Sequence, residues 1–232
     1  CAAFCEMDGY VSANQTGDAY TKALKENNVE IVENFEVSKI NNSNNNYEII
    51  DIYGKKINAN KIVLAAGVYL EKILKLVDIN IKIKCFPQQL IVTERMPELL
   101  KTVITVAHGK LSLKQFENGT VLIGGGWPGK GNIENGYNET IPENLIGNMR
   151  LACHAIPNLK NSRVSRVWLG LEAETDDAMP IIGELPNLKN AFIIGSIHSG
   201  YTSGPYMGKL LSEKILGNDV DLSLFDIKRL MN

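Results

Sequence analysis

Two kinds of hydrophobic pattern alternate along the chain. Positions that switch between apolar and polar are typical of antiparallel strands with one face in solvent. Five stretches have this pattern: residues 47–53, 81–94, 102–107, 110–116 and 120–124. Two short runs, 61–65 and 191–194, are instead continuously apolar, which is typical of strands covered on both faces. We therefore expect an antiparallel sheet together with a layer of buried strands.

Helical periodicity predicts four helices. They are expected at residues 14–27, 68–77, 142–154 and 203–216. Shorter strands are expected at residues 4–5, 30–32, 35–40 and 163–171. Because both continuous apolar runs end in small residues and lead into helices, as in a nucleotide-binding layer, the predicted fold class is α+β, that is, mixed α/β.

Composition narrows the classes of function. The 232 residues carry a net charge of −2 and are 44% hydrophobic, so we expect an ordinary globular protein without a nucleic-acid surface. No apolar run is long enough to cross a bilayer, and no secretory signal is visible. Four cysteines without a Cys-x-x-Cys pair argue against a structural zinc site. We expect a cytoplasmic protein, with peripheral membrane association left open, and a piece of a longer one, since the chain opens with Cys1.

The most informative stretch follows the second continuous apolar run. Small residues, among them Gly195, Ser196, Ser199 and Gly200, connect that strand directly to the last helix. They would let a ligand approach the backbone, and the N–H groups at the helix start would favour an anion or a developing negative charge. Alternatively, the glycines serve only the geometry of a tight turn. The local pattern leaves both interpretations open.

Other candidate sites are weaker. Residues 124–131 nearly match a phosphate-binding loop, but Gly131 replaces the required hydroxyl and no helix follows, so we reject that site. Arg166 and Trp168 share one strand face and could clamp a planar or carboxylate ligand, although core packing of the Trp is equally compatible. His198 is either a base or a structural residue. The carboxylates at 172–177 could hold a cation, but a solvated turn explains Asp176 and Asp177 better.

Taken together, several landmarks resemble the FAD-dependent D-amino acid oxidase superfamily, in particular its glycine/sarcosine oxidase and opine oxidase or hydrogen cyanide synthase-like branches. The landmarks run in order along the chain: Asp8-Gly9-Tyr10-Val11, the strand at 35–40, Ile62-Val63-Leu64-Ala65-Ala66-Gly67, Pro87-Gln88-Gln89, Leu122-Ile123-Gly124-Gly125, Arg166-Val167-Trp168-Leu169-Gly170-Leu171-Glu172, Asp177-Ala178-Met179-Pro180-Ile181-Ile182-Gly183 and His198-Ser199-Gly200. The resemblance covers nearly the whole chain.

The resemblance implies an oxidoreductase that transfers a hydride from the CH–NH group of an amino acid or secondary amine to FAD. It also implies an incomplete FAD-binding Rossmann-like layer, at residues 1–80 and 160–232, and an antiparallel substrate domain, at 81–159. The residues that it assigns to FAD are Val37, Ala65, Ala66, Gly67, Gly183, Ser196, His198, Ser199, Gly200, Tyr201, Thr202 and Ser203. Those that it assigns to the substrate and catalysis are Trp168, Gln89, Glu172 and Tyr201.

Two departures from the family pattern matter. Family members begin with a strand–GxGxxG–helix unit for the FAD pyrophosphate, and this chain opens without one. Glycine oxidase-like members place a carboxylate-binding Arg where this chain has Glu172, so the substrate carboxylate is held elsewhere or the substrate presents a cation. No Cys lies between Arg166 and Gly183, so the resemblance implies non-covalent FAD.

These departures leave a second interpretation open. The chain could be a non-catalytic binding or assembly module, or a truncated subunit without flavin. The expected partners are a small amino-acid or amine substrate, and the N-terminal remainder or another redox subunit.

Overall fold

A computed structural model describes residues 2–43, 46–107, 109–133, 138–196 and 198–231. The chain divides into two units. The first contains Cys1–Ala23 and Phe86–Leu171, and the second contains Leu24–Cys85 and Glu172–Asn232. Compared with the predicted division, residues 1–23 and 160–171 join the unit that holds the antiparallel sheet. The assignment of the units to cofactor and substrate stays a prediction.

The first unit is built on a five-stranded sheet with the order β11-β5-β8-β7-β6. Its strands are β5 (Lys84–Thr93), β6 (Ile104–Thr105), β7 (Ser112–Gln115), β8 (Val121–Gly124) and β11 (Val164–Glu174). β6, β7 and β8 form an antiparallel meander, and β5 pairs antiparallel with β8, so that Leu113 lies opposite Ile123 and Ile123 opposite Ile91. A short hairpin of β9 (Lys130–Gly131) and β10 (Asn138–Glu139) lies outside this sheet. The predicted alternation is confirmed in these strands.

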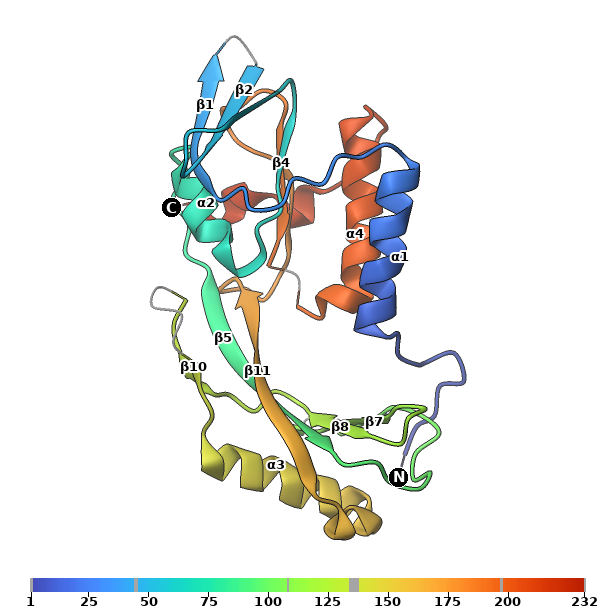
Figure 1. Cartoon of the computed structure of the whole chain (residues 1–232). Helices are drawn as coiled ribbons and strands as arrows, with labels where there is room; N and C mark the ends of the chain where they lie inside the picture. Colours follow the sequence, from blue (N-terminus) through green and yellow to red (C-terminus); the bar gives the residue numbers. More distant parts are fainter. Residues whose placement is uncertain (1, 44–45, 108, 134–137, 197, 232) are drawn as a thin grey trace. The chain divides into compact units, whose positions relative to one another are not determined.

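Helix α3 (Pro142–Ala155) covers one face of this sheet (Figure 1). It begins with Pro142 in its first turn, as predicted, and the 3-10 turn η2 (Pro157–Asn161) follows it. Ala152 of α3 and Leu159 of η2 are fully buried in a core with Ile91, Leu113 and Ile123. This apolar contact holds α3 on the sheet, since burial of aliphatic side chains is the dominant favourable term in folding.

The second unit contains the layer of short apolar strands. β4 (Ile62–Leu64) runs parallel to β13 (Ala191–Gly195), which pairs antiparallel with β12 (Ile181–Glu184). Helix α2 (Leu70–Lys75), preceded by the 3-10 turn η1 (Gly67–Tyr69), and helix α4 (Gly200–Ile215) pack on opposite faces of this sheet (Figure 1). Leu70 and Leu74 contact the core of Ile62, Leu64 and Ile193, whereas Leu211 packs with Ile182 and Phe192.

A second antiparallel sheet completes this unit. β1 (Val37–Ser43), β2 (Asn46–Asp51) and β3 (Lys56–Ala59) form it in sequence order. Tyr47 of β2 is fully buried, and its hydroxyl donates a hydrogen bond of 2.6 Å to the Lys189 carbonyl, which ties this sheet to the segment before β13. Two 3-10 turns, η3 (Ser223–Phe225) and η4 (Ile227–Leu230), end the chain.

Helix α1 (Ala13–Glu26) confirms the first predicted helix. It has no buried residue, so its apolar face, which includes Tyr20 and Leu24, is exposed. The helix begins in the first unit and ends in the second.

Several predictions about strands were wrong. Residues 4–5 and 30–32 are not strands, because these short segments pair with no neighbouring strand in the described part of the chain. β4 is not covered on both faces: it lies at the edge of its sheet, and Val63 is 45% exposed. β12 was not predicted, and α4 begins three residues earlier than expected.

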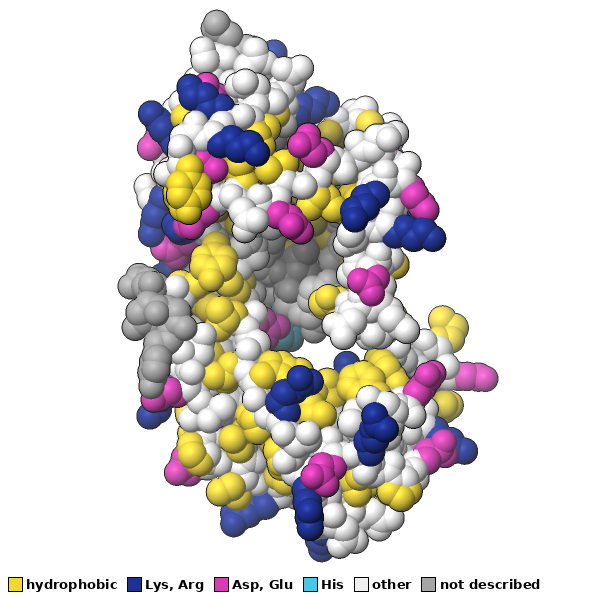
Figure 2. All heavy atoms as spheres, viewed as in Figure 1, with side chains coloured by type: hydrophobic (Ala, Val, Ile, Leu, Met, Phe, Trp, Pro, Cys, Tyr) yellow, Lys and Arg dark blue, Asp and Glu magenta, His cyan; other side chains and the backbone are white. Residues whose placement is uncertain are grey.

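Large hydrophobic side chains are exposed at many positions, among them Phe4, Met7 and Tyr53. On the face shown in Figure 2, Lys and Arg side chains are interspersed with Asp and Glu, in agreement with the small net charge. Among the described residues, no helix combines the length and the apolar character that a membrane span requires.

Candidate cofactor-binding edge

The parallel pairing of β4 and β13 places two loops at one edge of the sheet. Leu64 lies opposite Ile193, so Ala65 and Ala66 follow β4 where Gly195 and Ser196 end β13. β12 enters at the same edge, because Ile181 lies opposite Gly195. Ligands of open α/β sheets bind beyond the carboxyl ends of parallel strands. The structure therefore brings together three of the predicted segments: 65–67, 181–183 and 195–203.

Glycines keep the backbone of these segments accessible. A Cβ placed on Gly67, Gly183 or Gly200 would meet no atom within 4 Å. Gly67 and Gly183 have φ values of +54° and +146°, which side-chain-bearing residues rarely adopt. A planar group could therefore approach the main chain closely at these three positions.

Ser196 is the least satisfied polar residue of this edge. It is only 3% exposed, has a φ of +51°, and its hydroxyl oxygen has no hydrogen-bond partner. A buried polar atom without a partner is unfavourable unless a ligand or water supplies one. Two other buried side-chain oxygens lack partners among the described residues, those of Gln88 and Asn138.

Helix α4 starts directly after this loop. Ser199 adopts a left-handed conformation, and its carbonyl accepts hydrogen bonds from the N–H groups of Thr202 and Ser203. Gly200 and Tyr201 are the first two helical residues, whose N–H groups have no acceptor within the helix. The Tyr201 side chain is exposed. Of the predicted loop, Ile197 lies outside the described residues.

A short contact between two polar side chains ties the loop to β11. His198 Nδ1 lies 2.8 Å from Glu172 Oε1, so two predicted site residues contact each other. Glu172 is partly buried and His198 is largely exposed. This contact gives His198 a positioning partner and gives Glu172 a donor other than a substrate.

The side chain of Arg229, which the sequence analysis did not single out, holds the turn before β12. The Arg229 guanidinium donates to the Asp177 carboxylate, with Nε 2.7 Å from Oδ2, and to the carbonyls of Met179 and Pro180. These hydrogen bonds hold the pKa of Asp177 well below its usual range. Arg229 lies 52 residues from Asp177 and carries no local motif, so only the folded chain reveals the pair.

Asp176, the other aspartate of this turn, is paired as well. Asp176 lies 2.7 Å from Lys84 Nζ, and this contact lowers the pKa of Asp176. Asp177 and Glu172 have the partners described above. Within the described residues, no three His, Cys, Asp or Glu side chains form a metal-binding group.

The other predicted residues occupy different surroundings. Val37 begins β1, in the separate three-stranded sheet. In the first unit, the Arg166 guanidinium lies 5.1 Å from the Trp168 ring centroid, so the predicted shared face is confirmed and the Arg stacks on the Trp. Gln89 is buried, and its amide is engaged by Ile141: Oε1 accepts from the Ile141 N–H at 2.6 Å, and Nε2 lies 3.4 Å from its carbonyl.

The glycine-rich stretch of the first unit is not a phosphate loop. Gly124, Gly126 and Gly129 have GxGxxG spacing, but the chain continues into strand β9 rather than into a helix. The dinucleotide-binding motif needs a helix start at that point, because the helix N-terminus binds the pyrophosphate.

Comparisons with known proteins agree with this architecture. Residues 1–214 match the protein family described as FAD dependent oxidoreductase (DAO). The chain is 29% identical over 222 residues to the hydrogen cyanide synthase subunit HcnC of Pseudomonas protegens, an alignment that covers 92% of this chain and 51% of that protein. It is 24% identical over 231 residues to an opine oxidase subunit of Rhizobium meliloti, covering 97% of this chain and 58% of that protein.

The fold is also found among solved structures. The crystal structure of L-proline dehydrogenase from P. horikoshii matches with a TM-score of 0.80 and 24% sequence identity, over 92% of this chain and 58% of that chain. The chain spans about half the length of the curated relatives that it matches. Since the family match includes the two parallel strands and the glycine-lined edge beyond them, the chain belongs to the FAD dependent oxidoreductase family.

Proposed function

We propose that the chain forms part of an FAD-dependent oxidoreductase that oxidises the CH–NH group of an amino acid or secondary amine. The family is FAD dependent, and relatives include an opine oxidase subunit and a proline dehydrogenase. The observation that carries the proposal is the edge beyond β4 and β13. There the main chain is open at Gly67, Gly183 and Gly200, and the Ser196 hydroxyl is buried without a partner.

These residues fit a planar, hydrogen-bonding cofactor. When bound, FAD accepts the hydride that leaves the amine-bearing carbon. The open glycines would allow the ring to lie against the main chain, and the Ser196 hydroxyl would gain the partner that it lacks. The first N–H groups of α4 would stabilise negative charge at the edge of the ring, since a helix N-terminus carries about half a positive charge. The remaining residues assigned to FAD by the resemblance are part of this proposal.

We further propose that the pyrophosphate is bound by a segment outside residues 1–232, with FAD held non-covalently. Three observations support this. The described residues contain no strand–GxGxxG–helix unit, the chain spans about half the length of its relatives, and β4 is an edge strand that pairs with β13 on one side only, with Val63 exposed. A parallel strand at this edge would cover Val63 and satisfy the free side of β4.

For the substrate, we propose contacts with Trp168, Gln89, Glu172 and Tyr201, as the resemblance implies. Glu172 cannot replace an arginine that binds a carboxylate, because the two charges are opposite. Its Oε1 faces His198, so the remaining carboxylate oxygen is available for an ammonium or N–H group of the substrate. Relatives named as subunits also lead us to propose that the protein works with a second polypeptide.

The test is anaerobic reduction of the flavin in the purified natural protein that contains these residues. We expect absorption bands at about 370 and 450 nm, and bleaching of the second band on mixing with sarcosine, glycine or proline. Lactate, which has a hydroxyl in place of the amine, should not bleach it. A colourless protein would contradict the proposal and favour the alternative of a non-catalytic assembly module.

A further inference from the structure

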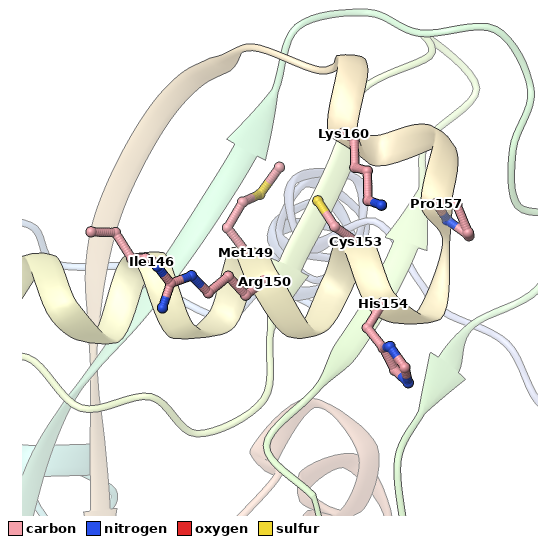
Figure 3. Close-up of a pocket in the computed structure, with 7 residues that line it drawn as sticks. All are labelled: Ile146, Met149, Arg150, Cys153, His154, Pro157 and Lys160. Carbon is pink, nitrogen blue, oxygen red and sulfur yellow. The ribbon is translucent and has the colours of Figure 1, made fainter.

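A groove runs along the exposed side of α3 in the first unit. Its volume is about 650 Å³. Side chains of α3 at helical spacing line it together with two residues of the following corner: Ile146, Met149, Arg150, Cys153, His154, Pro157 and Lys160 (Figure 3). The volume is within the range of pockets that hold small molecules, roughly 300–1,000 Å³.

The floor of this α3 groove is apolar and fixed. Met149 and Cys153 are half-buried, and both pack against the core under the helix. Ile146 is 51% exposed at one end, and Pro157 lies at the other. An aliphatic chain lying along these residues would remove apolar surface from water, which stabilises binding by about 25 cal/mol per Å².

The rim is cationic. Arg150, His154 and Lys160 line the groove, and no acidic residue does. Within the described part of the chain, none of the three has a hydrogen bond or an ion pair from its side chain. Some other bases, among them Lys56, Lys84 and Arg229, are paired with carboxylates. What distinguishes the groove is that its bases lie together around an apolar floor.

The helix itself does not account for all three basic residues. A base in the last turn is favoured by the helix dipole, which explains His154. Arg150 lies farther inside α3, and Lys160 lies in η2. Figure 3 shows the Met149 side chain between those of Arg150 and Lys160, with Lys160 beside Cys153. Two cations therefore flank the apolar floor.

We propose that the α3 groove binds an amphipathic monocarboxylate, with its aliphatic chain over Ile146, Met149 and Cys153 and its carboxylate held by Arg150 or Lys160. The carboxylate of the ligand would accept charge-assisted hydrogen bonds from either cation. It would thus be the acidic partner that the groove itself lacks. This site lies entirely in the first unit and does not depend on the proposed function.

The first test is calorimetric titration of the purified natural protein with octanoate. We expect saturable binding at one site per chain and binding of acetate, which has no aliphatic chain, weaker by about tenfold or more. In the double variant R150Q/K160Q, octanoate affinity should fall by about tenfold or more, whereas K101Q, an exposed lysine paired with Glu98, should bind as the wild type does. Equal binding in wild type and R150Q/K160Q would overturn the proposal.

A second readout does not depend on how well the variants fold. In the wild type, saturating octanoate should slow iodoacetamide alkylation of Cys153, while alkylation of the exposed Cys5 should be unchanged. Equal rates at Cys153 with and without octanoate would overturn the proposal. So would a wild type that ignores octanoate but changes its oligomeric state on R150Q/K160Q substitution, because the groove would then be a surface for an acidic polypeptide.

Discussion

Two neighbouring connections at one edge of the second unit differ in how their polar groups are satisfied. The turn that enters β12 is closed on itself: Thr175 is buried with its hydroxyl 2.7 Å from Asp177 Oδ1, and Arg229 binds the turn from outside. The loop that leaves β13 is open, with Ser196 buried and unpaired and no side-chain cap on α4. The pairing of Ile181 with Gly195 makes them neighbours.

This difference in hydrogen bonding indicates a structural role for the turn before β12 and a binding role for the loop after β13. The hydrogen bonds of Thr175 and Asp177 give the turn a structural role, whereas a buried hydroxyl without a partner needs an explanation. The closed turn positions Gly183, and the open loop retains capacity for a ligand. We therefore expect substitutions in the turn to reduce stability and substitutions in the loop to reduce cofactor binding.

The largest effect on stability should follow Arg229→Met. This change removes donors to Asp177, to Met179 and to Pro180, and leaves the Asp177 carboxylate without its cation. We expect a loss of about 3 kcal/mol in the free energy of unfolding, measured by urea denaturation. The exposed Arg163→Met variant is the control, with a change within about 0.5 kcal/mol. Equal losses in both would show that Arg229 does not hold the turn.

A paired substitution sharpens the contrast between turn and loop. Thr175→Val keeps the side-chain shape but removes a buried hydroxyl that is hydrogen-bonded, so we expect a loss of about 1–2 kcal/mol. Ser196→Ala removes a hydroxyl without a partner, so the apo protein should lose less than about 0.5 kcal/mol or gain stability. Thermal unfolding of the apo proteins measures both. A larger loss for Ser196→Ala would reverse the assignment of the two connections.

The smallest effect should be a pH dependence that Asp177 contributes. Because its pKa is lowered in the folded state, its contribution is present above the unfolded pKa of about 4 and is lost as the pH falls below that value. The stability difference between wild type and Asp177→Asn should therefore shrink as the pH is lowered from about 6 to about 3. Denaturant titrations across this range measure it, and a difference that stays constant would contradict the assignment.

Much of the fold could be predicted because local pattern and tertiary structure agree. The apolar runs became β4 and β13, Pro142 began α3, and the alternating stretches formed the antiparallel meander. Strands at 4–5 and 30–32 failed because strand formation needs a partner that local sequence does not specify. Val63 was predicted to be buried but is exposed, because β4 lies at the edge of its sheet and the local sequence does not specify the order of strands.

The candidate site was predicted in part. Gly183, Ser196 and Gly200 were assigned to the cofactor from a family resemblance and from small residues between strand and helix. The structure brings their segments to one edge of the sheet, and their role stays a prediction. Arg229 was missed because its partner is distant in sequence. The hydrogen bonds between the Gln89 amide and the Ile141 backbone were also not predicted, because no local sequence pattern indicates the partner of a glutamine side chain.

The most direct test of the central claim is the FAD content of the purified natural protein with a bulky residue at the open edge. Gly200→Leu would place a side chain where the main chain is accessible, whereas Gly208→Leu adds the same bulk two turns along α4, also in open space. We expect FAD affinity about tenfold weaker or worse in Gly200→Leu and unchanged in Gly208→Leu, measured by absorbance and by FAD titration. Equal FAD content in the two variants would contradict the account.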